Sequence, residues 1–189
     1  MAVQLPRATA DSIPVSIIID DLGYSLERGR QAIEMPAALT YSILPQTPYS
    51  RPLAELAHLN NKEVLLHLPM EGSRLDVNEP DTLNERMPEA VFRSTVQNQL
   101  LQVPHVVGVN NHMGSMLTPR SLQMNWLMEE LAGRSLFFVD SRTTAATVAS
   151  LAAQRHEVPF LQRDVFLDND RDNASIRAAF LHLVRLAKE

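Results

Sequence analysis

A run of β-branched residues near the start of the chain, Ile17–Ile19, ends abruptly at two adjacent carboxylates, Asp20 and Asp21, with Gly23 close behind. Such a run is typical of a strand that is buried on both faces, as in a parallel sheet. Two neighbouring acids at the mouth of a buried strand repel each other and lose hydration, which is costly unless a cation or a proton lies between them. The alternative is a solvated turn that caps a helix, and this stretch alone leaves both interpretations open.

The same arrangement, an apolar run followed by a helical pattern, repeats along the rest of the chain. The later strands are expected at 39–44, 63–68, 105–109, 136–139 and 159–163, and the helices at 25–35, 51–59, 88–102, 118–132, 146–155 and from 173 to the C-terminus. Six βα units with short connections predict an α/β fold in which helices cover a parallel sheet. The polar stretch 72–87 has no periodicity, and we expect it to lie over the site as a mobile loop.

Composition narrows the classes of function. At 189 residues we expect one domain over 14–189, preceded by a flexible lead-in over 1–13. The formal charge of -5 argues against a nucleic-acid partner, and no apolar stretch approaches the ~20 residues of a transmembrane helix. The absence of cysteine excludes a thiolate zinc site and a cysteine nucleophile, and it suits an oxidising compartment. Because 1–14 lacks the apolar core of a signal peptide, any export signal is expected to have been removed.

Polar and titratable residues gather where the expected strands end. They are Asp20, Asp21, His67, Glu71, Asn111, His112, Asp140 and Arg142. In parallel α/β folds the carboxyl ends of the strands lie on one face, where active sites are built. The distribution therefore predicts an active site on that face.

Asp21, His67 and His112 form a suitable ligand set for a divalent metal, for which zinc is our expectation. A catalytic zinc ion takes about three protein ligands and leaves one position for water. Asp20, beside the metal, is the expected general base. The alternative is that both histidines are neutral groups hydrogen-bonded to neighbouring strand ends.

Other polar residues are given supporting roles. Asp140 and Arg142 are expected to act in catalysis by orienting a ligand histidine or holding substrate, although a strand-end salt bridge between them is equally open. Pro69 forbids the helix that would align His67 with Glu71, so Glu71 is expected behind the ligands. Asn111, Ser115 and Arg163 are expected beside the ligands or the substrate. An aspartate phosphotransferase is disfavoured because Asp20 and Asp21 would face opposite ways on an extended chain.

The segments IIIDDLG, HLPMEG, VNNHMGS, DSRT and RDVFLDN, in this order between Pro14 and Glu189, resemble the divergent polysaccharide deacetylase family of bacterial envelope proteins. The resemblance implies a deformed (β/α) barrel of seven strands and a metal-dependent site that removes acetyl groups from a glycan. It also implies a periplasmic or otherwise exported protein. In better-known relatives the first acid of the pair is the base and the second a metal ligand, which corresponds to Asp20 and Asp21.

The chain departs from the family pattern in two ways. Ordinary deacetylases carry two histidines four residues apart after the third strand, and here Glu71 replaces the second. The seventh strand, expected to carry a histidine that acts as general acid, is absent from this sequence. We expect an open barrel edge through which copies can associate. These departures leave a second interpretation, a non-catalytic envelope protein that binds a glycan or a partner through a degenerate site.

Overall fold

The computed structural model describes residues 13–73 and 81–189, so most of the expected lead-in and the middle of the 72–87 loop lie outside the described residues. The described residues form two compact units. The larger spans Ile18–Gln162, and the smaller combines 13–17 with Arg163–Glu189. The two units are described separately below.

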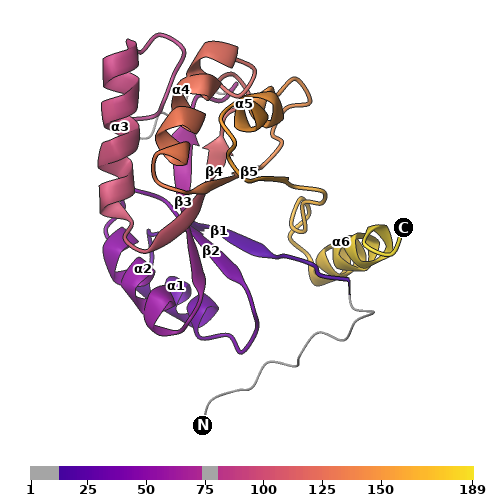
Figure 1. Cartoon of the computed structure of the whole chain (residues 1–189). Coiled ribbons are helices and arrows are strands. Elements are labelled where there is room, and N and C mark those ends of the chain that lie inside the picture. Colours follow the sequence, from indigo (N-terminus) through magenta and orange to yellow (C-terminus); the bar gives the residue numbers. More distant parts are fainter. Residues whose placement is uncertain (1–12, 74–80) are drawn as a thin grey trace. The chain divides into compact units, whose positions relative to one another are not determined.

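The larger unit is a six-stranded parallel sheet in which strands follow one another in chain order. Its strands are β1 (Ile18–Leu22), β2 (Thr40–Ile43), β3 (Glu63–Met70), β4 (Val106–Met113), β5 (Phe137–Asp140) and β6 (Phe160–Gln162). The helices between them are α1 (Leu26–Ile33), α2 (Ser50–Leu59), α3 (Glu89–Gln102), α4 (Ser121–Ala132) and α5 (Ala149–Arg155). Figure 1 shows these helices following one another around the outside of the strands. The predicted α/β fold with six βα units is confirmed.

The two faces of the sheet differ in polarity. One face packs against the helices through fully buried side chains such as Leu66 on β3, Phe92 on α3 and Phe138 on β5. Full burial of a side chain of this size stabilises the fold by about 1.5–3 kcal/mol. Because side chains alternate along a strand, the residues next to Leu66 and Phe138 in the sequence point to the other face of the sheet. There the sheet carries buried polar groups, including His67 and Asn110.

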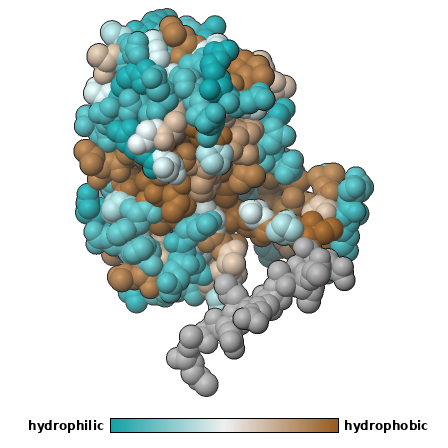
Figure 2. Space-filling view, viewed as in Figure 1, coloured by the Kyte–Doolittle hydropathy of each residue, from teal (hydrophilic) through white to brown (hydrophobic). Residues whose placement is uncertain are grey.

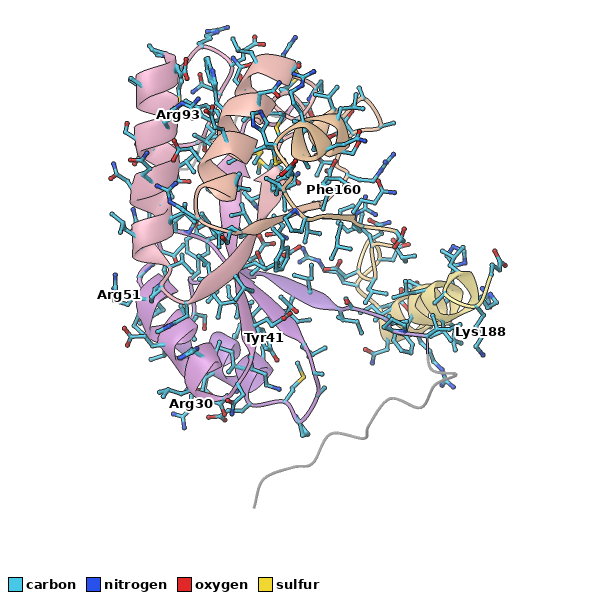
Figure 3. The ribbon with its side chains drawn as sticks, in the orientation of Figure 1. Arg30, Tyr41, Arg51, Arg93, Phe160 and Lys188 are labelled. Carbon is cyan, nitrogen blue, oxygen red and sulfur yellow. The ribbon has the colours of Figure 1, made fainter. Side chains whose placement is uncertain are left out.

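Charged side chains hold the outer layer of helices together. Arg93 on α3 reaches towards α4, where its guanidinium group lies 2.6 Å from Glu129 and 3.3 Å from Glu130 (Figure 3). The surface over these two helices is mostly hydrophilic (Figure 2). The hydroxyl of Ser25 begins α1 by accepting a hydrogen bond from the backbone N–H of Arg28, as an N-cap residue does.

The central strands extend further than the sequence pattern indicated. We expected β3 to end at residue 68 and β4 at 109, but they continue to Met70 and Met113. The two strands pair in parallel from Val64 opposite Val106 to Met70 opposite Met113, with one register shift after Val64, and Pro69 lies opposite His112. Pairing between the strands thus keeps the polar end of β4 in the sheet, although its residue types favour a loop. The start of α4 also differs from the prediction, because the helix begins at Ser121 and not directly after Thr118.

The described end of the long loop returns to the carboxyl end of β3. The backbone N–H of Leu83 donates to the carbonyl of Pro69, and that of Glu71 donates to the carbonyl of Leu83. Residues 81–87 therefore lie at the edge of the sheet that carries the polar residues, as predicted.

The described sheet begins at β1 and ends at β6. Among the described residues β1 pairs only with β2, β6 pairs only with β5, and no seventh strand is present. The association of copies of the chain through an edge strand stays a prediction.

The smaller unit contains helix α6 (Asn173–Leu186). The Asp172 carboxylate caps it by accepting hydrogen bonds from the backbone N–H groups of Ala174 and Ser175. Before the helix, the guanidinium group of Arg163 lies over the ring of Phe166, 3.4 Å from its centroid. Across the described residues, every helix is too short or too polar to cross a bilayer.

Candidate metal centre

Three side chains from three strands converge at the carboxyl edge of the sheet: Asp21 from β1, His67 from β3 and His112 from β4. The Oδ1 atom of Asp21 lies 3.2 Å from Nε2 of His67 and 3.2 Å from Nδ1 of His112. The two ring nitrogens are 3.1 Å apart. The three donor atoms therefore form a nearly equilateral triangle. The residues predicted as metal ligands are the ones that the fold brings together.

This triangle fits a divalent metal ion. With bonds of about 2.0–2.1 Å, the donor atoms of a tetrahedral zinc site lie about 3.3 Å apart, and those of an octahedral site about 3.0 Å apart. The observed separations of 3.1–3.2 Å lie between these values. Two imidazole nitrogens and one carboxylate oxygen also suit zinc and several other transition metals. The donor set and its spacing thus match a divalent ion without selecting one.

A β-bulge in β1 brings the carboxylates of Asp20 and Asp21 to the same imidazole ring, that of His67. The pairing of β1 with β2 shifts register between Ile19 and Leu22, and Asp21 has a left-handed backbone with φ of 61°. Bulges of this kind re-aim side chains beside active sites, and aspartate tolerates the left-handed region better than most residues. Oδ1 of Asp20 lies 3.8 Å from Nδ1 of His67, while Oδ1 of Asp21 lies 3.2 Å from its Nε2. The expectation that the two acids face opposite ways was wrong, because β1 is not regular there.

The turn after β1 requires glycine. Gly23 has φ of 138°, and a Cβ atom at this position would lie 2.0 Å from Oγ1 of Thr47. The backbone carbonyl of Gly23 accepts a hydrogen bond from the N–H of Tyr49, which ties the turn to the start of α2. This packing fixes the chain immediately after the acid pair.

The cluster perturbs the charges of its members. Hydrogen bonds from His112 and then His67 hold the pKa of the Asp21 carboxyl well below its usual value, against a smaller opposing effect of burial. For His67, burial is the largest single effect and disfavours the charged form. The hydrogen bond to Asp21 and the charges of Asp20 and Asp21 outweigh it, so the pKa of His67 is raised. An ionised carboxylate thus faces the buried histidine.

Asp20, the expected base, is held by a residue that the sequence analysis missed. Its Oδ1 atom accepts a hydrogen bond of 2.8 Å from the side-chain amide of Asn110. The Oδ1 atom of Asn110 lies 2.9 Å from Nδ1 of His67 and accepts a 2.5 Å hydrogen bond from the hydroxyl of Ser42. Asn110 and His112 are two residues apart on β4 and share a face. Period-two alternation would have identified Asn110 if the strand had been extended that far.

Three of the other predicted residues shape the turns around the site. A carboxylate oxygen of Glu71 accepts from the N–H of Glu85, and its backbone carbonyl accepts from the N–H groups of Met116 and Leu117. The side chain of Asn111 accepts from the N–H of Ser141 and donates to the carbonyl of Met113. The hydroxyl of Ser115 accepts from the N–H of Ser73. Glu71, Asn111 and Ser115 therefore connect the segments that surround the metal cluster, and they are not members of it.

Asp140 lies at the end of β5, outside the metal cluster. Its buried carboxylate accepts from the backbone N–H of Arg142 and from the hydroxyl of Thr147, so both oxygens stabilise the turn that follows the strand. Arg142 donates from its guanidinium group to the side chain of Gln162 on β6. Arg163 belongs to the smaller unit. Catalytic or substrate-binding roles for Asp140, Arg142 and Arg163 stay predictions.

A parallel α/β sheet with an Asp–His–His cluster at its carboxyl edge defines a candidate metal-binding domain of the α/β class. The chain belongs to the divergent polysaccharide deacetylase family, whose sequence profile matches residues 17–189.

Two curated relatives carry no assigned function. The chain is 39% identical over 178 residues to the uncharacterized protein YibQ of Escherichia coli K12, covering 92% of this chain and 54% of YibQ. It is 32% identical over 175 residues to an uncharacterized protein of Haemophilus influenzae, covering 93% of this chain and 62% of that protein. The chain therefore spans a little over half the length of these relatives.

Solved structures share the fold. An uncharacterized protein from Agrobacterium tumefaciens C58 superposes with a TM-score of 0.91 at 24% identity, over 97% of this chain and 76% of that one. A lactam utilization protein from Thermus thermophilus superposes with a TM-score of 0.55 at 12% identity, over 87% of this chain and 74% of that one. At these identities the similarity establishes the architecture alone.

Proposed function

We propose that the chain is a metal-dependent deacetylase that removes acetyl groups from a polysaccharide of the bacterial envelope. The observation that carries the proposal is the triangle of Asp21, His67 and His112 donor atoms with the Asp20 carboxylate beside it. Family membership supplies the class of substrate. From the family resemblance we also propose that the protein acts outside the cytoplasm, which fractionation of cells that express the full-length protein would test.

Each residue has a separate task in this proposal. Asp21, His67 and His112 would hold the ion, which supplies Lewis-acid polarisation of the acetyl carbonyl and lowers the pKa of water. Asp20 lies next to the cluster without sharing the triangle, so its carboxylate is available to take a proton from the attacking water. Water adds its oxygen to the carbonyl carbon, the C–N bond breaks, and the proton leaves with the amine. The products are acetate and a free amino sugar.

The origin of the third ligand supports an intact site. Glu71 stands where ordinary deacetylases have their second histidine, and its side chain accepts from the backbone of Glu85. His112, from the neighbouring strand, occupies the third corner of the triangle. The substitution at Glu71 therefore leaves a complete set of three donors.

Acetate release from N-acetylated oligosaccharides tests the proposal. We expect zinc-loaded protein to release acetate and the Asp20→Asn variant to be slower by about 10²- to 10⁴-fold while it retains zinc. Asp21→Asn should lose both zinc and activity. Glu27→Gln, which changes an exposed acid on α1, is the matched control and should change neither. Zinc and glycan binding without acetate release by the wild type would instead establish the non-catalytic glycan-binding alternative.

A further inference from the structure

The side chain of Asn110 connects the expected base to a metal ligand. It is 2% exposed and lies on the polar face of β4. Its amide nitrogen donates to Asp20 at 2.8 Å, and its amide oxygen lies 2.9 Å from Nδ1 of His67 and 2.5 Å from the hydroxyl of Ser42. One buried amide therefore contacts groups from β1, β2 and β3.

The partners of Asn110 determine which way its amide faces. An ionised carboxylate only accepts hydrogen bonds, so the NH₂ group of Asn110 must face Asp20. The amide oxygen then faces Ser42 and His67, both of which must donate to it. Nδ1 of His67 consequently carries the hydrogen. A metal ligand must be a neutral imidazole, which has one N–H, so in that ring Nε2 presents its lone pair to the centre of the triangle.

We propose that Asn110 is a positioning residue that holds His67 in the tautomer able to bind metal and ties the same ring to Asp20. The metal half of this inference stands on the cluster alone, and the Asp20 half rests on the proposed function. In the opposite tautomer, a hydrogen on Nε2 would point into the triangle, and the lone pair on Nδ1 would face the oxygen of Asn110. That tautomer cannot serve as a ligand. The single amide thus sets both the ring's orientation and its free nitrogen.

Loss of such an outer hydrogen-bond partner typically lowers metal affinity 10- to 100-fold. Asn110→Leu has a similar volume and cannot accept a hydrogen bond, so we expect its zinc affinity to fall by that factor. Asn110→Asp keeps an acceptor for Nδ1 of His67 and should restore zinc affinity to within about threefold of the wild type, which a purely packing role would not explain.

Nitrogen-15 NMR of the imidazole rings in the metal-free protein reads the tautomer directly at a pH high enough for His67 to be neutral, because the ion pair with Asp21 raises the pKa of His67. We expect wild-type His67 to show a protonated Nδ1 and an unprotonated Nε2, and Asn110→Leu to show a mixture. Asn111→Ala is the control: it changes the adjacent buried amide, which bonds to the turns after β4 and β5, and should leave the His67 pattern unchanged.

Two results would overturn the inference. One is a wild-type spectrum with the hydrogen of His67 on Nε2, which decides the question even if Asn110→Leu does not fold. The other is a folded Asn110→Leu variant with wild-type zinc affinity and an unchanged His67 spectrum. Neither readout uses acetate, so an inactive wild type would remove the proposed function and leave the role of Asn110 standing.

Discussion

Nε2 of His67 and Nδ1 of His112 lie 3.1 Å apart although 45 residues separate them in the chain. The register of β3 and β4 produces this contact, with His67 opposite Asn110 and Pro69 opposite His112. A slip of one residue would turn one of the two rings to the other face of the sheet. Two imidazole nitrogens at this distance are stable only with a proton or a cation between them, and Asp21 adds the compensating negative charge.

Zinc should therefore stabilise the fold. A ligand that binds only the native state at 100 times its dissociation constant adds about 2.7 kcal/mol to the free energy of unfolding. We expect the melting temperature to rise with zinc and to return with EDTA, as measured by calorimetry. Asp21→Asn should show no such response. An equal rise in this variant would indicate that zinc acts elsewhere on the chain.

The free energy of unfolding of the metal-free protein should depend on pH, because the cluster contains charged groups. Asp21 has a pKa lowered from 3.8, so its contribution is fully present above pH 3.8 and is lost as the pH falls further. His67 has a pKa raised from 6.5, so its contribution is fully present below pH 6.5 and is lost as the pH rises through the raised value. We expect urea unfolding in the presence of a chelator to show the largest difference in free energy of unfolding between wild type and Asp21→Asn between about pH 4 and 6.5, with wild type the more stable. A constant difference from pH 3 to 9 would contradict the ion pair.

Glu71 should matter for the loop and not for the metal. Glu71→Ala removes the acceptor of the Glu85 N–H, so hydrogen exchange of residues 81–87 should accelerate while zinc affinity stays within about twofold. Glu63→Ala, at the opposite end of the same strand, is the control and should leave the loop unchanged. A loss of zinc affinity in Glu71→Ala would make Glu71 a ligand.

The packing between β4 and β5 leaves no room for a side chain at position 108. A Cβ atom at Gly108 would lie 2.6–2.8 Å from the ring of Phe137, so Gly108→Ala should lower the free energy of unfolding by about 1–3 kcal/mol. At Gly133, after α4, the nearest atom would be 3.6 Å away, and Gly133→Ala should be neutral or slightly stabilising. Chemical denaturation of both variants checks the pair, and similar losses would mean that the sheet is packed differently.

The order of strands and helices could be read from the sequence because each apolar run and each helical period is a local signal. The end of β4 could not be read from the sequence, because Asn110, Asn111 and His112 are residue types typical of loops. Only pairing with β3, which is a non-local interaction, keeps them in the sheet. That error concealed the shared face of Asn110 and His112.

The ligand set was predictable, whereas its geometry was not. Carboxyl ends of parallel strands meet at one edge, so Asp21, His67 and His112 could be grouped from strand order alone. The bulge that turns Asp21 towards both histidines depends on how β1 and the turn at Gly23 pack against β2 and Thr47. Nothing in the sequence of β1 by itself specifies a left-handed Asp21.

The central claim is that Asp21, His67 and His112 form one metal site, and zinc titration of His112→Ala against a chelator of known affinity tests it most directly. Wild type should bind one zinc ion per chain. His112→Ala should bind at least about 100-fold more weakly while remaining folded, since loss of an outer partner alone costs 10- to 100-fold. His156→Ala, which alters a histidine bonded to Asn125 outside the cluster, should match wild type. Equal zinc affinity in His112→Ala and wild type would contradict the claim.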